Sequence, residues 1–249
     1  MTRISGYHRP SNLADAIALL ERSEVTTALL GGGTVLNGVP DSVPDEVVDL
    51  QDLGLGTVSR DGSTLSFGAM VPLQDVVDHE WTPPALRDLA HGEAPNTFRN
   101  AATVGGTVAA ADPESRLLAG LLAYGAVVTL AGAAGEEQIS VADLLADRQH
   151  LDGKVIVAVA VDVGGNGASA GTGRTPADTP IVLVAGRRDE NGKITLAATG
   201  VAATPISITI ESIASLDPPS DFRGSPDYRR HLAGVLGARV VAQLEGAAS

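Results

Sequence analysis

The sequence predicts an α+β fold in two parts, and three observations support this prediction. Segments with strand-like and helix-like hydrophobic patterns alternate along the 249 residues without a regular βαβ repeat. Two glycine-rich segments, residues 31–36 and 102–113, interrupt the earlier part of the chain. A third glycine-rich stretch, residues 164–180, marks a break in composition. We therefore expect a first part over residues 1–163 and a smaller α+β part over residues 164–249.

The first part begins with a helix and a series of strands. Residues 11–22 carry leucine, isoleucine and alanine at helical spacing, with Ser11 or Asn12 as the N-cap. A short apolar strand, residues 26–30, leads directly into the first glycine-rich segment. Further strands are predicted at residues 47–50, 56–59 and 64–67, with a hairpin turn at Asp61 and Gly62, followed by helices at residues 72–79 and 84–91.

The second glycine-rich segment contains an unusual concentration of small residues. Gly105 and Gly106 stand between Thr103 and Thr107, and only valine and alanine follow before Asp112. A glycine pair can take positive φ and lets a ligand approach the backbone, where exposed N–H groups can bind an anion such as phosphate. The segment therefore predicts a pocket wall, and a tight turn that leads into a helix is the structural alternative.

A helix is predicted directly after this segment, over residues 114–124, with Asp112 as its N-cap and Pro113 at the first position. The β pattern then resumes at residues 126–130, 137–139 and 155–161, with a short helix at residues 141–146.

The second part contains a predicted hairpin and two helices. Residues 164–180 are interpreted as a linker or a mobile loop. The hairpin strands are residues 181–187 and 193–198, and helices are expected at residues 205–216 and 225–244. The buried face of the last helix is predicted to carry Leu232, Val235, Leu236, Val240 and Leu244.

Composition excludes several classes of function. A net charge of −13 argues against nucleic acid or an anionic membrane surface as the partner, because either would be repelled. The chain has no cysteine, so it can hold no disulfide or iron–sulfur cluster, and any electron-transfer metal must lie on a partner. The N-terminus lacks a hydrophobic signal segment and no apolar run reaches the length of a membrane span. We expect a cytoplasmic protein.

A serine hydrolase is the alternative from another class. Residues 167–171 match the G-x-S-x-G pattern with Ser169 as the nucleophile, and Asp217 and His231 follow in the order that α/β-hydrolases use. That motif needs a strand that ends at the serine and a helix that starts just after it. Glycine, threonine and proline follow Ser169 instead, which disfavours the hydrolase.

Taken together, LLGGGTVL at residues 29–36 and ATVGGTVAAADP at residues 102–113 resemble the two phosphate loops of a known family. It comprises the FAD-binding subunits of molybdenum hydroxylases, namely the medium subunit of carbon monoxide dehydrogenase and the flavin domain of xanthine dehydrogenase. The opening GYHRPSNLADAIALL, the strand VVDL and SDFRGSPDYRRHLAGVL at residues 220–236 also resemble family signatures, so the similarity spans nearly the whole chain.

The resemblance implies an FAD-binding domain of the vanillyl-alcohol-oxidase type over residues 1–163, with two subdomains that meet near residues 50–55. A C-terminal domain of the molybdenum-hydroxylase flavoprotein type would follow over residues 164–249. Leu36, Ala94 and Ile156 match positions near the flavin or adenine, where ordinary core packing is an equal alternative. The positions that match the FAD site are Gly32, Gly33, Thr34, Val35, Leu36, Thr103, Gly105, Gly106, Thr107, Ala110 and Ile156.

Two positions depart from the family pattern. Thr107 stands where asparagine is usual, and Arg116 stands where an aspartate commonly holds the adenosine ribose. Arginine cannot accept a hydrogen bond. These departures motivate an alternative function, a subunit that keeps the fold, lacks flavin and serves as an interaction scaffold.

The implied mechanism is electron relay. A molybdopterin-binding large subunit would oxidise the substrate, a 2Fe-2S small subunit would pass single electrons, and FAD on this chain would collect them for an external acceptor. The resemblance also implies a dimer of heterotrimers. No residue of this chain is expected to act as a catalytic acid or base, and its five histidines show no spacing that suits a metal.

Overall fold

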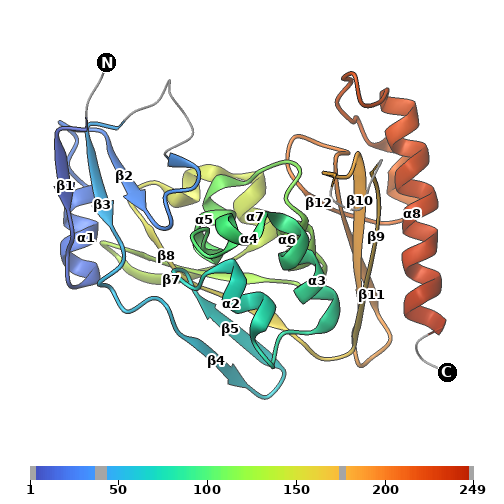
Figure 1. Cartoon of the computed structure of the whole chain (residues 1–249), viewed down its shortest axis with the longest axis horizontal. Helices are drawn as coiled ribbons and strands as arrows, with labels where there is room; N and C mark the ends of the chain where they lie inside the picture. Colours follow the sequence, from blue (N-terminus) through green and yellow to red (C-terminus); the bar gives the residue numbers. More distant parts are fainter. Residues whose placement is uncertain (1–3, 37–43, 174–177, 247–249) are drawn as a thin grey trace.

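The computed structural model describes residues 4–36, 44–173 and 178–246. Three sheets follow one another along the long axis of the molecule, from the N-terminal strands at one end to helix α8 (Pro226–Gly246) at the other (Figure 1). Helices and strands both make up large parts of the chain, which confirms the predicted α+β class.

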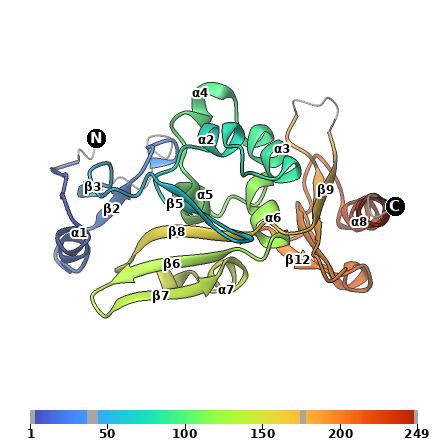
Figure 2. The same cartoon turned by 90° about the horizontal axis from the view of Figure 1, so that it is seen from below.

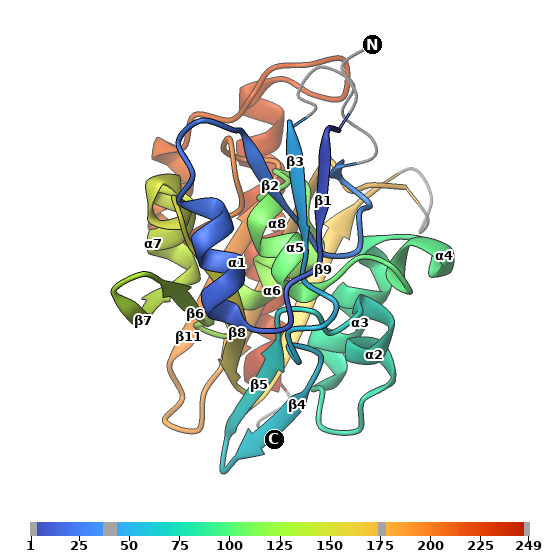
Figure 3. The same cartoon turned by 90° about the vertical axis from the view of Figure 1, so that its left-hand side faces the viewer.

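The first sheet is small and parallel, and α1 lies beside it (Figure 3). Its strands run in the order β1, β3, β2. The side chain of Asn12 accepts a hydrogen bond from the main-chain N–H of Asp15 at 2.9 Å, so Asn12 is the N-cap of α1. The elements are β1 (Gly6–His8), α1 (Leu13–Leu20), β2 (Thr27–Leu30) and β3 (Glu46–Asp49).

The second sheet is antiparallel, with its strands in the order β4, β5, β8, β6, β7. Helices α2 to α6 lie on one side of it (Figure 2). Gly62 takes a φ of +57° in the turn between β4 and β5, as the predicted hairpin requires. The strands are β4 (Val58–Asp61), β5 (Thr64–Gly68), β6 (Val127–Gly132), β7 (Gly135–Ser140) and β8 (Val155–Asp162). The helices are α2 (Leu73–Asp78), α3 (Pro84–Glu93), α4 (Asn96–Arg99), α5 (Val104–Ala110), α6 (Arg116–Ala123) and α7 (Val141–Ala146), with a 3₁₀ turn η2 (Arg148–Leu151).

The third sheet packs between helices α6 and α8. Its order is β12, β11, β10, β9, all antiparallel. Side chains alternate along β10, so Leu183 and Ala185 join the core that contains α6, whereas Val182 and Val184 join the core under α8. The elements are β9 (Asn166–Thr172), β10 (Val182–Arg188), β11 (Ile194–Thr199), β12 (Ile206–Ile208), a 3₁₀ turn η3 (Glu211–Ser215) and α8 (Pro226–Gly246).

Three predictions about the second part are wrong. Residues 166–172 form strand β9 within the stretch interpreted as a linker, because their small side chains pair along β10. The helix expected at 205–216 is instead strand β12 followed by a 3₁₀ turn, since β-branched Ile206 and Ile208 alternate along an extended segment that pairs with β11. Val235 is 44% exposed and does not belong to the buried face of α8.

The start of α6 also differs from its prediction. The helix begins at Arg116 with Ser115 as its N-cap, whose hydroxyl accepts from the N–H of Leu118 at 3.1 Å. Asp112 instead accepts from the N–H of Glu114 at 2.8 Å, which closes a turn before the helix. Pro113 lies in that turn and not in the helix. No helix in the described ranges is both long and apolar enough to cross a membrane.

Candidate functional site

Two adjoining cavities form a cleft between the first sheet and helix α5. Their volumes are about 390 and 240 Å³, within or near the range of small-molecule sites. They form one continuous surface because several residues line both: Leu29, Gly31, Thr103, Gly106 and Ala109.

The cleft brings most of the residues predicted from the sequence together. Gly105 and Ile156 line the larger cavity, with Thr103 and Gly106. Thr107 lines neither cavity, because it points back along α5 and its hydroxyl donates to the carbonyl of Thr103 at 3.1 Å. Of the predicted residues, those that line the smaller cavity are Gly32, Gly33, Thr34, Val35, Leu36, Thr103, Gly106 and Ala110.

Ala94, the remaining position matched to the flavin, does not line this cleft either. It follows the last turn of α3, and its carbonyl accepts a hydrogen bond from Nη1 of Arg99 at 2.6 Å. This hydrogen bond explains the position of Ala94 without a bound ligand.

The first glycine-rich segment presses directly against the chain that precedes α5. A Cβ atom on Gly32 would lie 1.6 Å from the carbonyl oxygen of Ala101, so only glycine fits there. Gly33 has a φ of +71°, which also favours glycine. The two glycine-rich segments therefore meet main chain to main chain.

The second glycine-rich segment is a helix, and the main-chain amides of its two glycines already donate within the chain. The N–H of Gly105 donates to the carbonyl of Ala69 at 2.9 Å, and the N–H of Gly106 donates to Oγ1 of Thr103 at 3.0 Å. Neither glycine has positive φ. Gly105 is needed for close packing instead, because a Cβ there would lie 2.7 Å from that of Ala69.

In the described part of the chain, the amides of this cleft that lack a hydrogen-bond acceptor lie in the first segment. Among the residues that the structure describes, none accepts a hydrogen bond from the main-chain N–H of Gly32, Gly33 or Thr34. Successive N–H groups in a turn form a concave donor site that suits an anion. The smaller cavity therefore pairs three amide donors with the small side chains of α5.

Sequence reasoning missed Ala109, which lines both cavities. Alanine carries no chemical signal, and only its place on the exposed side of α5 gives it a role. Lys154, the one lysine or arginine among the described lining residues, was also missed. Its Nζ pairs with Glu137 and holds the pKa of that carboxyl below its ordinary value.

Arg116 lies outside this cleft. It lines a separate hollow of about 260 Å³ between α3, α6 and β9, together with Ser169. Ser169 sits in the middle of β9 opposite Ala185, with strand on both sides of it. That position rules out the strand-to-helix turn that a serine hydrolase requires.

Comparison with known proteins identifies similar chains. The family described as FAD binding domain in molybdopterin dehydrogenase matches residues 2–161. The chain is 29% identical to the uncharacterized protein YgfM of Escherichia coli K12, over 98% of both chains. It is 26% identical to the carbon monoxide dehydrogenase medium chain of Afipia carboxidovorans, over 94% of each. It is also 26% identical to the glyceraldehyde dehydrogenase medium chain of Sulfolobus acidocaldarius, over 92% of this chain and 94% of that one.

Solved structures show the same fold. A chain of the carbon monoxide dehydrogenase from Hydrogenophaga pseudoflava superposes with a TM-score of 0.88 at 24% identity, covering 99% of both chains. A chain of quinoline 2-oxidoreductase from Pseudomonas putida 86 gives a TM-score of 0.87 at 22% identity, covering 100% of this chain and 99% of that one.

Proposed function

This chain belongs to the family of FAD-binding domains of molybdopterin dehydrogenases, and from this premise we propose that its cleft holds FAD for electron relay. It would act as the medium subunit of a molybdenum hydroxylase, receiving electrons from an iron–sulfur subunit and passing them to an external acceptor. The observation that carries the proposal is the meeting of both glycine-rich segments at one cleft, where the amides of Gly32, Gly33 and Thr34 have no acceptor among the described residues.

The residues present fit the pyrophosphate of FAD. Amides of Gly32, Gly33 and Thr34 would donate to its oxygens, since charge-assisted bonds from main-chain N–H groups can bind phosphate without lysine. Gly106 and Ala109 on α5 leave room for the phosphates to lie against the helix. We propose that Val35, Leu36, Thr103 and Ala110 complete this wall, that Thr107 supports it through α5, and that Gly105 acts at the larger cavity, which it lines.

The larger cavity fits a planar ring of FAD. Leu29, Leu50, Met70 and Ile156 give it an apolar lining, as a heterocycle requires. When bound, FAD supplies the ability to exchange electrons one or two at a time. The protein binds and orients it. The described residues that line the smaller cavity include no titratable side chain, so no proton transfer is assigned to them.

Two of the relatives are medium chains of dehydrogenases, which supports large and small partner subunits for this chain. We propose that they are a molybdopterin-binding large subunit and a 2Fe-2S small subunit, in a dimer of heterotrimers. The absence of cysteine requires the cluster to lie on another chain. We also propose the division into domains at residues 1–163 and 164–249, because the second sheet ends at Asp162 and the third begins at Asn166.

The test is the flavin content of the complex purified from its native source. We expect it to release FAD on denaturation. In the Ala109→Leu variant the added side chain would fill the cleft and abolish binding, whereas Ala238→Leu, an exposed position on α8, would retain FAD. A wild-type complex that contains its partners but releases no FAD on denaturation would contradict the proposal and favour the flavin-free scaffold.

A further inference from the structure

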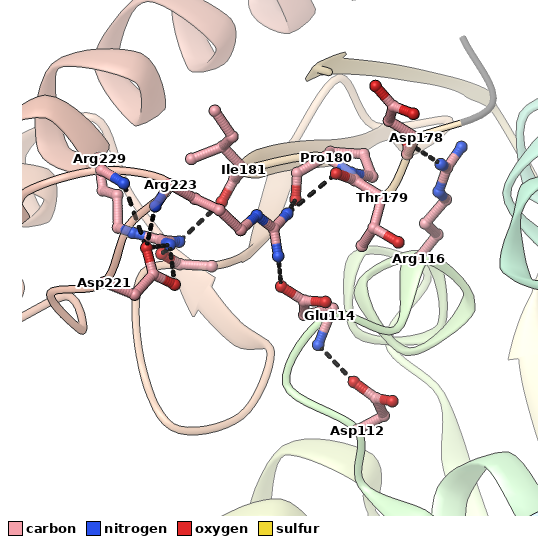
Figure 4. Close-up of polar contacts among 12 residues, drawn as sticks. Asp112, Glu114, Arg116, Asp178, Thr179, Pro180, Ile181, Asp221, Arg223 and Arg229 are labelled. Carbon is pink, nitrogen blue, oxygen red and sulfur yellow. Dashed lines mark hydrogen bonds and ion pairs between the residues drawn. The ribbon is translucent and has the colours of Figure 1, made fainter. Parts of the chain in front are cut away.

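Arginine side chains bind four consecutive main-chain carbonyl oxygens just before β10 (Figure 4). The three arginines come from two distant parts of the chain, one on α6 and two around the start of α8. The bonds run from Arg116 to Asp178 at 2.7 Å, from Arg223 to Thr179 at 2.9 Å and Pro180 at 2.8 Å, and from Arg229 to Ile181 at 2.9 Å.

Arg223 has a second set of contacts, on the turn between α5 and α6. Its Nη1 pairs with a carboxylate oxygen of Glu114. The main-chain N–H of Glu114 donates in turn to Asp112 at 2.8 Å. The guanidinium of Arg223 thus joins the start of β10 to the turn that follows α5, and no other side chain drawn in Figure 4 makes both contacts.

Arg223 is itself held in place. Its main-chain N–H donates to Oδ1 of Asp221 at 2.8 Å. Asp221 receives two bonds of 2.8 Å from Arg229, whose side chain is buried. Both bonds come from Nη2 of Arg229, one to each carboxylate oxygen, and charge-assisted bonds of this kind are stronger than neutral ones. The loop that carries Arg223 therefore has a defined position against the third sheet.

Arg223 binds the turn at Glu114, and this turn comes directly after α5, which forms one wall of the cleft. Ala110 lines the smaller cavity, and Glu114 is four residues further along. Between them Ala111 has a φ of +50°, a conformation that alanine adopts only when its surroundings impose it. The end of α5 is also tied from the other side, where Arg148 donates to the carbonyl of Ala109 at 2.5 Å.

We propose that Arg223 is a positioning residue for the FAD site. By holding Glu114 against the carbonyls of Thr179 and Pro180, it fixes the turn after α5 and so sets the place of Ala109 and Ala110 in the cleft. This inference rests on the proposed function. The inference gives residues 164–249 a role at the cleft, although no described residue of that part of the chain lines either cavity.

Arginine is the side chain that this role needs. Its planar group presents several N–H donors in a fixed fork, so it can bind one carboxylate and two carbonyls at once. Lysine would keep the charge opposite Glu114 but could not hold both carbonyls in the same geometry. The Arg223→Lys variant should therefore fall between wild type and Arg223→Gln.

The experiment measures the Kd for FAD of the whole chain freed of flavin, by quenching of flavin fluorescence, at a temperature where all variants are folded. We expect Arg223→Gln to weaken binding about tenfold, the size of effect that loss of a supporting contact has at other preorganised sites. Glu114→Ala should weaken it similarly. The double variant should be no weaker than Arg223→Gln alone, because both changes remove one contact.

Arg230→Gln is the matched control. Arg230 also binds a carbonyl, that of Leu216 at 2.9 Å, and a carboxylate, that of Asp227, but makes no contact with residues 112–116. It should change the Kd by less than about twofold. The visible circular dichroism of bound flavin should change in Arg223→Gln and not in Arg230→Gln.

Several results would overturn the inference. Arg223→Gln with the Kd of wild type would do so, as would equal weakening by Arg230→Gln, which would indicate general loosening. A wild-type chain that does not bind FAD at all would contradict the proposed function itself, and that outcome is read from wild type before any variant is compared.

Discussion

Among single residues of the cleft, Gly32 has the least space for a side chain. The space for its Cβ is occupied by the carbonyl of Ala101, which is backbone and cannot rotate away. We expect Gly32→Ala to lower the free energy of unfolding by about 3 kcal/mol, the upper end of typical overpacking costs, and to abolish FAD binding as the segments separate. Urea unfolding and flavin release measure the two effects.

Gly56→Ala provides the comparison for Gly32→Ala. Nothing lies within 4 Å of the Cβ position of Gly56, and its φ is not positive. Its unfolding free energy should stay within about 0.5 kcal/mol of wild type. If Gly32→Ala unfolded at the same urea concentration as Gly56→Ala, the close approach of the two segments would be wrong.

The sequence predicts single site residues well where glycine is required by the backbone. Gly32 and Gly33 line the cleft as expected, since a run of three glycines after a strand is typical of a turn that backbone or ligand approaches closely. Thr107 matches a loop position of the family, but helical geometry turns it away from the cavity. Ala109 could not be predicted, because an exposed alanine on a helix leaves no pattern in the sequence.

At the scale of elements, α5 shows how tertiary contacts override local preference. Two glycines in its first turn disfavour a helix by about 1 kcal/mol each. The helix forms because Thr103 caps it and because Val104 and Gly105 donate to the carbonyls of Val71 and Ala69. Those carbonyls belong to a segment more than thirty residues earlier, so no local pattern contained this information.

The end of α5 supplies the next prediction. Ala111 closes the helix in the left-handed conformation, where glycine has no Cβ penalty. Ala111→Gly should relieve about 1 kcal/mol of strain and lose part of that through the freer unfolded chain, for a net gain of about 0.5 kcal/mol. Thermal and urea unfolding both measure it.

Ala238→Gly, in the exposed interior of α8, is the opposite-signed control. It should cost about 0.5 to 1 kcal/mol, because the residue is helical and glycine is a poor helix former. A loss of stability in Ala111→Gly comparable to that in Ala238→Gly would show that residue 111 is not left-handed in solution.

In the C-terminal part, strands β9 and β12 also form through tertiary contacts that the local sequence does not show. Glycine, alanine and serine in β9 have low strand preference, and the segment becomes a strand only because β10 pairs with it along its whole length. By contrast, the hairpin of β10 and β11 was predicted from two strand-like segments on either side of residues 189–192, and this pattern is local.

At the scale of the whole molecule, α6 joins the parts of the fold. It is buried along its length and contacts α3 on one side and β10 and β11 on the other. The sequence predicts this helix and its apolar residues. It does not predict that both sides are covered, because the second cover is the third sheet, whose first strand resembles a linker. The α+β class was therefore predictable and the packing of its parts was not.

A carboxyl group at the N-terminus of α6 makes the stability of this packing depend on pH. Glu93 lies against it, and its Oε2 accepts from the main-chain N–H of Leu117 at 2.8 Å. Burial raises the pKa of Glu93 above the ordinary glutamate value of 4.5, despite this bond and one from Ser115. Arg229 does the reverse at Asp221, whose pKa lies below its ordinary value of 3.8. The two groups therefore act in different pH ranges.

Ionised Asp221 stabilises the folded state. This stabilisation is present above the ordinary pKa of the carboxyl and is lost as the pH falls through its lowered pKa in the folded state. For Glu93 the folded state holds its proton more tightly than the unfolded chain. Its contribution is fully present below the ordinary pKa and is lost as the pH rises through the raised value. From about pH 5 upward, Glu93 thus makes the fold less stable as the pH rises.

Glu93→Gln should remove this upper pH dependence. Glutamine has no charge to bury, and its side-chain oxygen can still accept from Leu117, so the variant should be more stable than wild type at about pH 8 and closer to it at about pH 5. Urea unfolding at both pH values measures the difference. Glu245→Gln, exposed at the end of α8, should leave the pH dependence unchanged. A Glu93→Gln chain less stable than wild type at both values would mean that the ionised carboxylate is a favourable cap of α6, and that its bond to Leu117 outweighs the cost of burying it.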